Sequence, residues 1–144
     1  MFKNILYPTD FSDVSMSALG YIKTLRETGA ETVILLHVID QRSLQAIEQY
    51  ASVQSLKLER EIMEDASKEL SSIESDLKQS GFKVKSRLEI GNPTMEILRI
   101  EEEEDVSVIV IGSHGKSNLE EIFMGSVSEK VVRKCKRPVL VIKR

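Results

Sequence analysis

The feature that most constrains the fold of this chain is a set of short, almost uninterrupted apolar runs, such as VILLHVI and VSVIVIG. Such runs are too short for helices, and they show no alternation of apolar and polar residues. This pattern is typical of strands buried on both faces of a parallel sheet. The predicted strands cover Asn4 to Tyr7, Thr32 to Ile39, Val106 to Ile111 and Val139 to Ile142, with a weaker, alternating one from Phe82 to Ile90.

Helical segments are predicted between these strands. The first has Ser12 as a plausible N-cap and ends at Gly29. The second runs from about Ser43 to Gln79 and is stopped by Gly81, although its first part, Gln41 to Ser55, is polar and ambiguous. Its single apolar stripe consists of Ile62, Ala66, Leu70, Ile73 and Leu77.

Two further helices complete the pattern. Asn92 and Pro93 are typical of an N-cap and a first helical residue, and this helix is expected to run through Ile100. In the last helix Ser126 and Glu129 are expected to form a capping box. The residues Val127, Val131 and Cys135 are expected to line its inner face.

The alternation of strands and helices predicts an α/β fold, a single doubly wound domain over residues 1–144 with helices on both faces of the sheet. Ligands of such sheets bind outside the carboxyl ends of the strands, where the strand order reverses. Two predicted strand ends carry unusual residues. These are Pro8, Thr9 and Asp10 after the first strand, and Gly112, Ser113, His114 and Gly115 after the fourth.

Composition excludes several classes of protein. The net charge of -3 argues against binding nucleic acid by electrostatics. No run of ~18 apolar residues occurs, so no membrane span is expected. The single cysteine, Cys135, and an opening sequence unlike a leader predict a reducing, cytoplasmic location. Two histidines and one cysteine argue against a transition-metal cage, whereas Mg²⁺ could arrive with a phosphate ligand.

The segment GSHGKSNLEEIFMGSVSEK has the composition of a phosphate site. Glycines at 112, 115 and 125 permit positive φ and close approach to a ligand. The N–H groups and hydroxyls around Ser126, Val127 and Ser128 would lie at the N-terminus of a helix, which favours phosphate. The alternative is that the glycines serve only turns and a helix cap. The Rossmann and Walker A spacings are both absent.

The spacing Gly112-x-x-Gly115, nine residues, then Gly125-Ser126 resembles the ATP-binding motif of the universal stress protein family. ILYPTDFS, LLHVID, VIVIGSHG and RPVLVIK resemble blocks of that family in the same order, so the resemblance covers essentially the whole chain. It implies a five-stranded parallel sheet of order 3-2-1-4-5. It also implies a homodimer paired through the last strand, Val139 to Ile142, an apolar edge that would otherwise be exposed.

The resemblance further implies which residues hold ATP, or ADP or AMP, with or without Mg²⁺. Pro8, Thr9 and Asp10 would lie at the adenine and ribose end, and Val38 would contact adenine. The residues implied around the ribose and phosphates are Gly112, Ser113, His114, Gly115, Gly125, Ser126, Val127 and Ser128.

Several interpretations stay open at this stage. The first is an ATP-binding stress-response or regulatory protein whose nucleotide orders the loop from Gly115 to Gly125. Others are a slow ATPase or nucleotidyl transferase using Asp10 and Mg²⁺, a phospho-receiver, which the lone Asp10 disfavours, and a ligand-free dimeric interaction module. His37 is expected to be a core histidine bonded to a neighbour, and the acidic run from Glu101 to Asp105 a solvated face.

Overall fold

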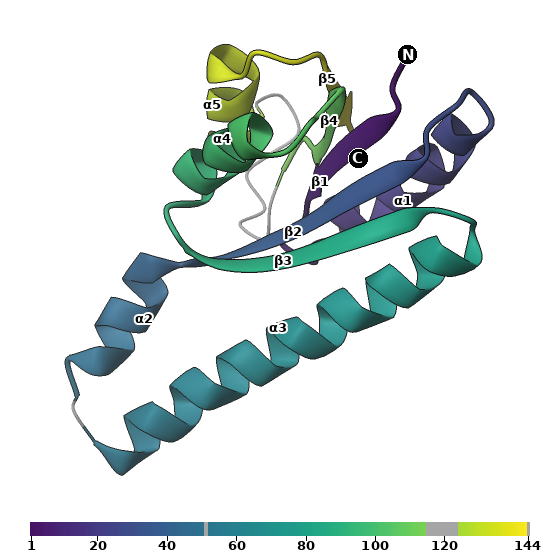
Figure 1. Cartoon of the computed structure of the whole chain (residues 1–144). Coiled ribbons are helices and arrows are strands. Elements are labelled where there is room, and N and C mark those ends of the chain that lie inside the picture. Colours follow the sequence, from purple (N-terminus) through teal and green to yellow (C-terminus); the bar gives the residue numbers. More distant parts are fainter. Residues whose placement is uncertain (51, 115–123, 144) are drawn as a thin grey trace.

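A parallel sheet forms the centre of the molecule in the computed structural model, which describes residues 1–50, 52–114 and 124–143 (Figure 1). Its five strands lie in the order β3-β2-β1-β4-β5, and every neighbouring pair is parallel. This confirms the predicted fold and strand order. The elements are β1 (Asn4–Pro8), α1 (Asp13–Arg26), β2 (Thr32–Asp40), α2 (Gln41–Glu48), α3 (Val53–Gln79), β3 (Lys83–Gly91), α4 (Pro93–Glu103), β4 (Val108–Gly112), α5 (Ser126–Lys134) and β5 (Val139–Ile142).

Helices cover both faces of the sheet and bury two separate apolar cores. Residues of α1 and α3 pack on one face and form the first core, whereas residues of α4 and α5 form the second core on the other face. Neighbouring residues of one strand alternate between them: Leu35 belongs to the first core and Leu36 to the second. This double burial explains why the central strands are apolar almost throughout.

Most predicted helix boundaries are confirmed by capping contacts. The Ser12 side chain accepts a hydrogen bond from the Ser15 N–H at the start of α1, and Asn92 does the same for Met95 at the start of α4. Pro93 is the first residue of α4, where its missing N–H has no intrahelical partner to lose. Gly29, with φ 108, follows the end of α1 and supplies a backbone conformation that other residues rarely adopt.

The ambiguous segment before the long helix contains a helix of its own. Asp40 caps the start of α2. A second helix, α3, begins at a capping box formed by Ser52 and Ser55. Residue 51, which precedes this box, lies outside the described residues. Figure 1 shows α2 and the first turns of α3 extending past the end of the sheet. The apolar stripe is buried only farther along, at Ala66, Leu70, Ile73 and Leu77. None of the described helices is long and apolar enough to cross a membrane.

The capping box predicted for the last helix is wrong. Gly125, not Ser126, is the N-cap of α5, and no side chain caps the helix. The reason is that the Gly125 N–H donates to the Ser113 carbonyl at 2.7 Å, so the chain is already fixed one residue before Ser126. Glu129 instead forms an ion pair with Arg133 one turn later.

The acidic run from Glu101 to Asp105, at the end of α4, is also only partly a solvated face. Glu101 is buried, and its carboxylate accepts the N–H groups of Lys136 and Arg137 at 2.8 and 2.7 Å. It therefore fixes the connection between α5 and β5. Cys135, beside this connection, packs against the second core as predicted, and burial raises the pKa of its thiol.

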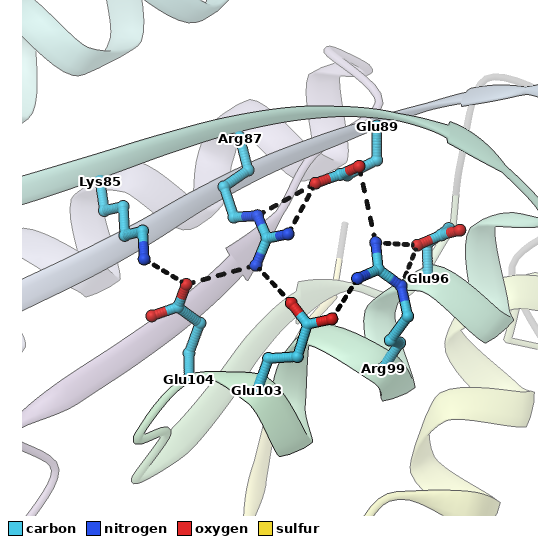
Figure 2. A network of polar contacts seen from close by, with 7 residues as sticks. All are labelled: Lys85, Arg87, Glu89, Glu96, Arg99, Glu103 and Glu104. Atoms are coloured by element: carbon cyan, nitrogen blue, oxygen red, sulfur yellow. Dashed lines mark hydrogen bonds and ion pairs between the residues drawn. The ribbon is translucent and has the colours of Figure 1, made fainter.

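Other residues of the acidic run join an ionic network between β3 and α4 (Figure 2). Arg87 on β3 pairs with Glu89, Glu103 and Glu104 at 2.8 to 3.3 Å. Arg99 on α4 pairs with Glu89, Glu96 and Glu103. Lys85 adds a pair to Glu104 at 2.6 Å. Charged groups thus fill the junction between this edge strand and α4.

Candidate functional site

A cavity of ≈ 360 Å³ lies where the carboxyl ends of β1, β2 and β4 meet. The two strand ends with unusual residues lie side by side, since β1 and β4 are neighbours in the sheet. The residues lining the cavity are Pro8, Thr9, Asp10, Ser15, Leu36, Val38, Asp40, Pro93, Ile97, Ile111, Gly112, His114, Gly125, Ser126, Val127 and Ser128.

The two sides of the cavity differ in chemistry. On the side of β2 and α4 its wall includes Leu36, Val38 and Ile97, which are apolar. On the side of β4 and α5 it includes Gly112, His114 and the first turn of α5. Because β1 lies between β2 and β4, these two walls are separated by one strand. The site can therefore take a ligand with an apolar, flat part and a polar or anionic part.

Gly112 is glycine for a reason that the sequence did not suggest. A Cβ at this position would lie 3.1 Å from the Ser15 nitrogen and 3.2 Å from the Ser15 Cα, so a side chain would fit only if β4 and α1 moved apart by a few tenths of an ångström. Among the described glycines only Gly29 and Gly81 have positive φ, and Gly125 has φ -61. The prediction of positive φ is therefore wrong for Gly112 and Gly125, and Gly115 lies outside the described residues.

Two of the predicted hydroxyl donors are engaged within the chain. The Ser128 hydroxyl donates to the Ser113 carbonyl at 2.7 Å and to the Gly125 carbonyl at 3.0 Å. Ser113 is buried, and its hydroxyl lies 2.8 Å from His114 Nδ1. These bonds hold the end of β4 against the start of α5. Among the described residues, the groups that remain to meet a ligand include the first-turn N–H groups of Ser126, Val127 and Ser128, which have no partner within the helix.

His114 presents an unusual atom at the cavity. Its Nε2 is buried and has no hydrogen-bond partner among the described residues, although its Nδ1 is held by Ser113. A buried polar atom without a partner is costly in a folded protein. A ligand oxygen or N–H group in the cavity could supply the missing partner.

The turn after β1 is fixed by several hydrogen bonds. The Thr9 hydroxyl accepts from the Phe11 N–H at 3.0 Å and from the Ser15 hydroxyl at 2.7 Å. The Tyr7 hydroxyl donates to the Ser15 carbonyl at 2.7 Å. Burial raises the pKa of this hydroxyl. Asp10 Oδ1 accepts the Ser12 N–H at 3.0 Å, so its carboxylate serves the turn as well as the cavity wall.

A second carboxylate, that of Asp40, lies at the cavity beside the end of β2. Hydrogen bonds from the exposed Arg42 side chain lower the pKa of Asp40 and keep it ionised. In the described ranges no three His, Cys, Asp or Glu side chains gather closely enough to hold a metal ion. The described wall thus carries carboxylates without forming a metal cage.

The structure brings most predicted site residues together. Ten of them line the cavity directly, Ser113 lies behind it as a hydrogen-bonding partner, and Gly115 is outside the described residues. The bond predicted for His37 is confirmed, since its Nδ1 lies 2.7 Å from the Thr9 carbonyl oxygen, but the residue is half-buried and not part of either core. The lining residues that sequence reasoning missed are Ser15, Leu36, Asp40, Pro93, Ile97 and Ile111.

A signal for part of the missed wall was present in the sequence. Asn92 and Pro93 begin a helix directly after a strand, and helices that follow parallel strands start at the carboxyl edge of the sheet. Leu36 and Ile111 lie toward the carboxyl ends of two predicted strands, which is a further signal. The sequence does not show, however, on which face of the sheet these two side chains lie, because that depends on which helices cover each face.

Comparison with solved structures supports the fold over the whole chain. The structure of MJ0577 superposes with a TM-score of 0.90 at 45% identity, covering 100% of this chain and 97% of that one. Two more distant structures share the fold at a TM-score of 0.65. One is a universal stress protein in complex with cAMP, at 19% identity, and the other is a family member from Arabidopsis thaliana with AMP bound, at 18%. They cover 99% of this chain, which in turn matches 97% and 92% of theirs.

Sequence comparison gives the same result. The universal stress protein MJ0577 of Methanocaldococcus jannaschii is 42% identical over 156 aligned positions, covering 100% of this chain and 96% of that protein. The universal stress protein YxiE of Bacillus subtilis is 30% identical, covering 99% of this chain and 100% of that one. The model of the universal stress protein family matches residues 1–143. This chain therefore belongs to the universal stress protein family.

Proposed function

We propose that this chain, acting as one nucleotide-binding domain over residues 1–144, binds an adenine nucleotide in the cavity between β1, β2 and β4, with ATP as its main ligand and ADP or AMP as alternatives. The observation that carries the proposal is the division of one cavity into an apolar wall and a wall built from a helix N-terminus. A nucleotide has the same division, since its base is flat and apolar on its faces and its phosphates are anionic.

The base is proposed to lie on the side of β2 and α4. Val38 and Leu36 offer β2 side chains, and Ile97 with Pro93 offers a facing wall from α4. Apolar walls of this kind bury most of the surface of a bound ring and contribute most of its binding free energy. Pro8 would close the same end from β1.

The phosphates are proposed to lie at the start of α5. The amides of Ser126, Val127 and Ser128 point out of the first turn, where the helix dipole favours an anion. His114 Nε2 would find its partner on the same ligand. Gly112, Ser113, Gly115 and Gly125 would complete this wall, with Ser113 and Ser128 positioning the backbone through their mutual bond.

Asp10 is proposed to contact the ribose hydroxyls rather than the phosphates, because a carboxylate repels an anion. Thr9, next to it, places backbone atoms at the same end of the cavity. Mg²⁺ would arrive with the nucleotide, because the described residues offer no metal cage of their own.

The proposed role is regulation in a stress response and not turnover. The Asp10 carboxylate already serves the turn by accepting the Ser12 N–H. Ser113 and His114 are hydrogen-bonded, but the Ser113 hydroxyl is buried behind the cavity wall, so this pair does not present a nucleophile to a ligand in the cavity. We place the protein in the cytoplasm, where its single cysteine, Cys135, would stay reduced.

A homodimer through β5 is the proposed assembly. In the described sheet β5 lies at one edge, and its Leu140 side chain is 37% exposed. An apolar edge strand is a template for pairing with a second copy. Light scattering should give the mass of two chains for the native protein and of one chain for Leu140→Lys, and a native monomer would contradict the assembly.

Titration calorimetry with Mg²⁺-ATP tests the proposed ligand, together with nucleotide extracted from the purified protein. Gly125→Val should weaken binding by about a hundredfold or more, because a β-branched side chain would occupy the approach to the first turn of α5. The backbone of Gly125 has φ -61, so valine fits its conformation and the loss would come from bulk.

Gly20→Val is the matched control, because a Cβ added at Gly20 on α1 meets no atom within 4 Å. It should bind like the native protein. Absence of binding by the native protein at millimolar ATP would refute the proposed ligand. Phosphate release from ATP, measured in the same samples, should equal the buffer background; release that disappears in Asp10→Ala would favour an enzyme instead.

A further inference from the structure

We propose that His37 is a positioning residue, which holds the β1–α1 turn (residues 9–12) in the shape that the bound nucleoside requires. The inference rests on the proposed nucleotide site, since its consequence is measured there. His37 does not line the cavity. Its role would be to hold the turn whose residues Thr9 and Asp10 do line the cavity.

The alternation of side chains along β2 places His37 on the far side of the strand from the ligand. Leu36 and Val38, its two neighbours, both line the cavity. Successive side chains of a strand point to opposite faces, so the His37 ring lies on the face of α1 and the first core. There it meets the turn that leads from β1 into α1.

The first contact is a hydrogen bond that crosses from β2 to the turn. His37 Nδ1 lies 2.7 Å from the carbonyl oxygen of Thr9. Since a carbonyl only accepts, Nδ1 carries the hydrogen and donates it. The Thr9 N–H in turn donates to the Leu36 carbonyl at 2.8 Å. Thr9 is therefore bound to β2 at both its N–H and its carbonyl.

The second contact is a stack on a residue in an uncommon backbone conformation. Phe11 has φ 65, and no other non-glycine residue in the described ranges has positive φ. The Phe11 and His37 rings stack with centroids 4.3 Å apart and an angle of 26° between their planes. Such a conformation persists only where surrounding contacts over-determine it. The stack and the bond from the Phe11 N–H to the Thr9 hydroxyl are such contacts.

Together the two contacts fix Thr9 and Asp10 before a ligand arrives. Both residues line the cavity. Thr9 is bound to His37 directly, and Asp10 lies in sequence between Thr9 and Phe11, whose ring stacks on the His37 ring. A binding segment that is already ordered loses less entropy when the ligand binds. Loosening the turn should thus weaken binding of the nucleoside portion without removing any atom that touches it.

Three variants separate the two contacts of His37. His37→Phe keeps a ring for the stack but lacks the donor, His37→Asn keeps a donor near the Nδ1 position but lacks the ring, and His37→Ala lacks both. Calorimetry should show affinity lowered about tenfold in His37→Ala and by about three- to fivefold in each of the other two. The factor should be the same for adenosine as for ATP, because the turn is proposed to contact the nucleoside and not the phosphates.

Hydrogen exchange of the ligand-free protein provides a readout that does not depend on a nucleotide. The Phe11 and Ser12 amides should exchange faster in His37→Ala, by about tenfold or more, than in the native protein. Ile22→Val is the control, because Ile22 is buried in α1 away from the cavity and its loss of one methylene lowers the melting temperature. Its nucleotide affinity should stay at the native value.

The outcomes distinguish the two proposals. Native exchange at Phe11 and Ser12 in His37→Ala, or native affinity for adenosine in that variant, would overturn the positioning role. A loss confined to ATP would overturn it as well. If the native protein binds neither adenosine nor ATP while exchange in the turn does respond to His37, the proposed nucleotide function fails and the hold of His37 on the turn stands.

Discussion

The two faces of strand β3 are held to the rest of the molecule by different chemistry. On one face Val84 and Leu88 pack against the first core, to which α3 contributes Leu70, Ile73 and Leu77. On the other face Lys85, Arg87 and Glu89 meet charged residues of α4 in the ionic network (Figure 2). One edge strand thus carries an apolar contact on one side and an ionic one on the other.

The difference shows how unequal these contacts are as sources of stability. Apolar burial contributes in proportion to the area removed from water, and a buried leucine contributes several kcal/mol. Ion pairs near the surface contribute little singly, because hydration and side-chain entropy offset the attraction. The network instead contributes geometric specificity, since Arg87 and Arg99 fix the position of α4 relative to β3 through several carboxylates. The following variants test this contrast, from the largest expected effect to the smallest.

Leu77→Ala should lower the free energy of unfolding by about 3 kcal/mol, because Leu77 is fully buried and the cavity left behind cannot fill. Urea denaturation measures this loss, which should be the same in low and in high salt. A loss under 1 kcal/mol would mean that α3 contributes less to the fold than its buried stripe indicates.

Arg87→Met removes the central cation of the network and keeps most of the aliphatic stem. The expected loss is about 1 to 2 kcal/mol, because three carboxylates lose a charged hydrogen-bond donor. Unlike the loss in Leu77→Ala, it should shrink in about 1 M salt, which screens exposed charges. A loss that does not depend on salt would show that Arg87 acts through packing.

Glu103→Gln should give a smaller loss that depends on pH. Hydrogen bonds from Arg87, the larger cause, and from Arg99 lower the pKa of Glu103 below its ordinary 4.5. A lowered carboxyl pKa contributes stability that is fully present above the unfolded value and is lost as pH falls through the folded one. The difference in unfolding free energy between native protein and variant should therefore be constant near neutral pH and disappear in acid, as measured by urea denaturation across that range.

Lys78→Ala should have the smallest effect, about 0.3 to 0.5 kcal/mol. Lys78 pairs with Glu74 one turn away on α3, and this pair has no link to the network. Thermal denaturation at matched pH tests the value. An effect as large as that of Arg87→Met would remove the distinction between an isolated pair and a network.

Features governed by short-range rules were predictable from the sequence. The caps Ser12 and Asn92 and the stripe through Leu70 and Leu77 depend on residues three or four positions apart, which the sequence displays directly. The carboxyl-edge location of the cavity followed from the parallel order of the strands. Here local pattern and tertiary structure agree.

Features that depend on the relative placement of distant segments were not predictable. The burial of Glu101 requires the amides of Lys136 and Arg137 to lie beside α4. The contribution of Ile97 to the cavity wall depends on how α4 crosses the sheet. The N-cap predicted at Ser126 is one residue too late, because the hydrogen bond from the Gly125 N–H to the Ser113 carbonyl cannot be inferred from the sequence. Each miss comes from a contact between segments far apart along the chain or from the geometry of packing.

The close approach of β4 to α1 at Gly112 changes how the motif should be interpreted in other chains. A side chain there would press β4 against the start of α1, so its neighbours would have to shift by a few tenths of an ångström whether or not a nucleotide is bound. Packing thus favours glycine at this position for a reason that does not involve a ligand. Its presence in a sequence reports an intact scaffold, and evidence for a functioning site must come from the later positions of the motif.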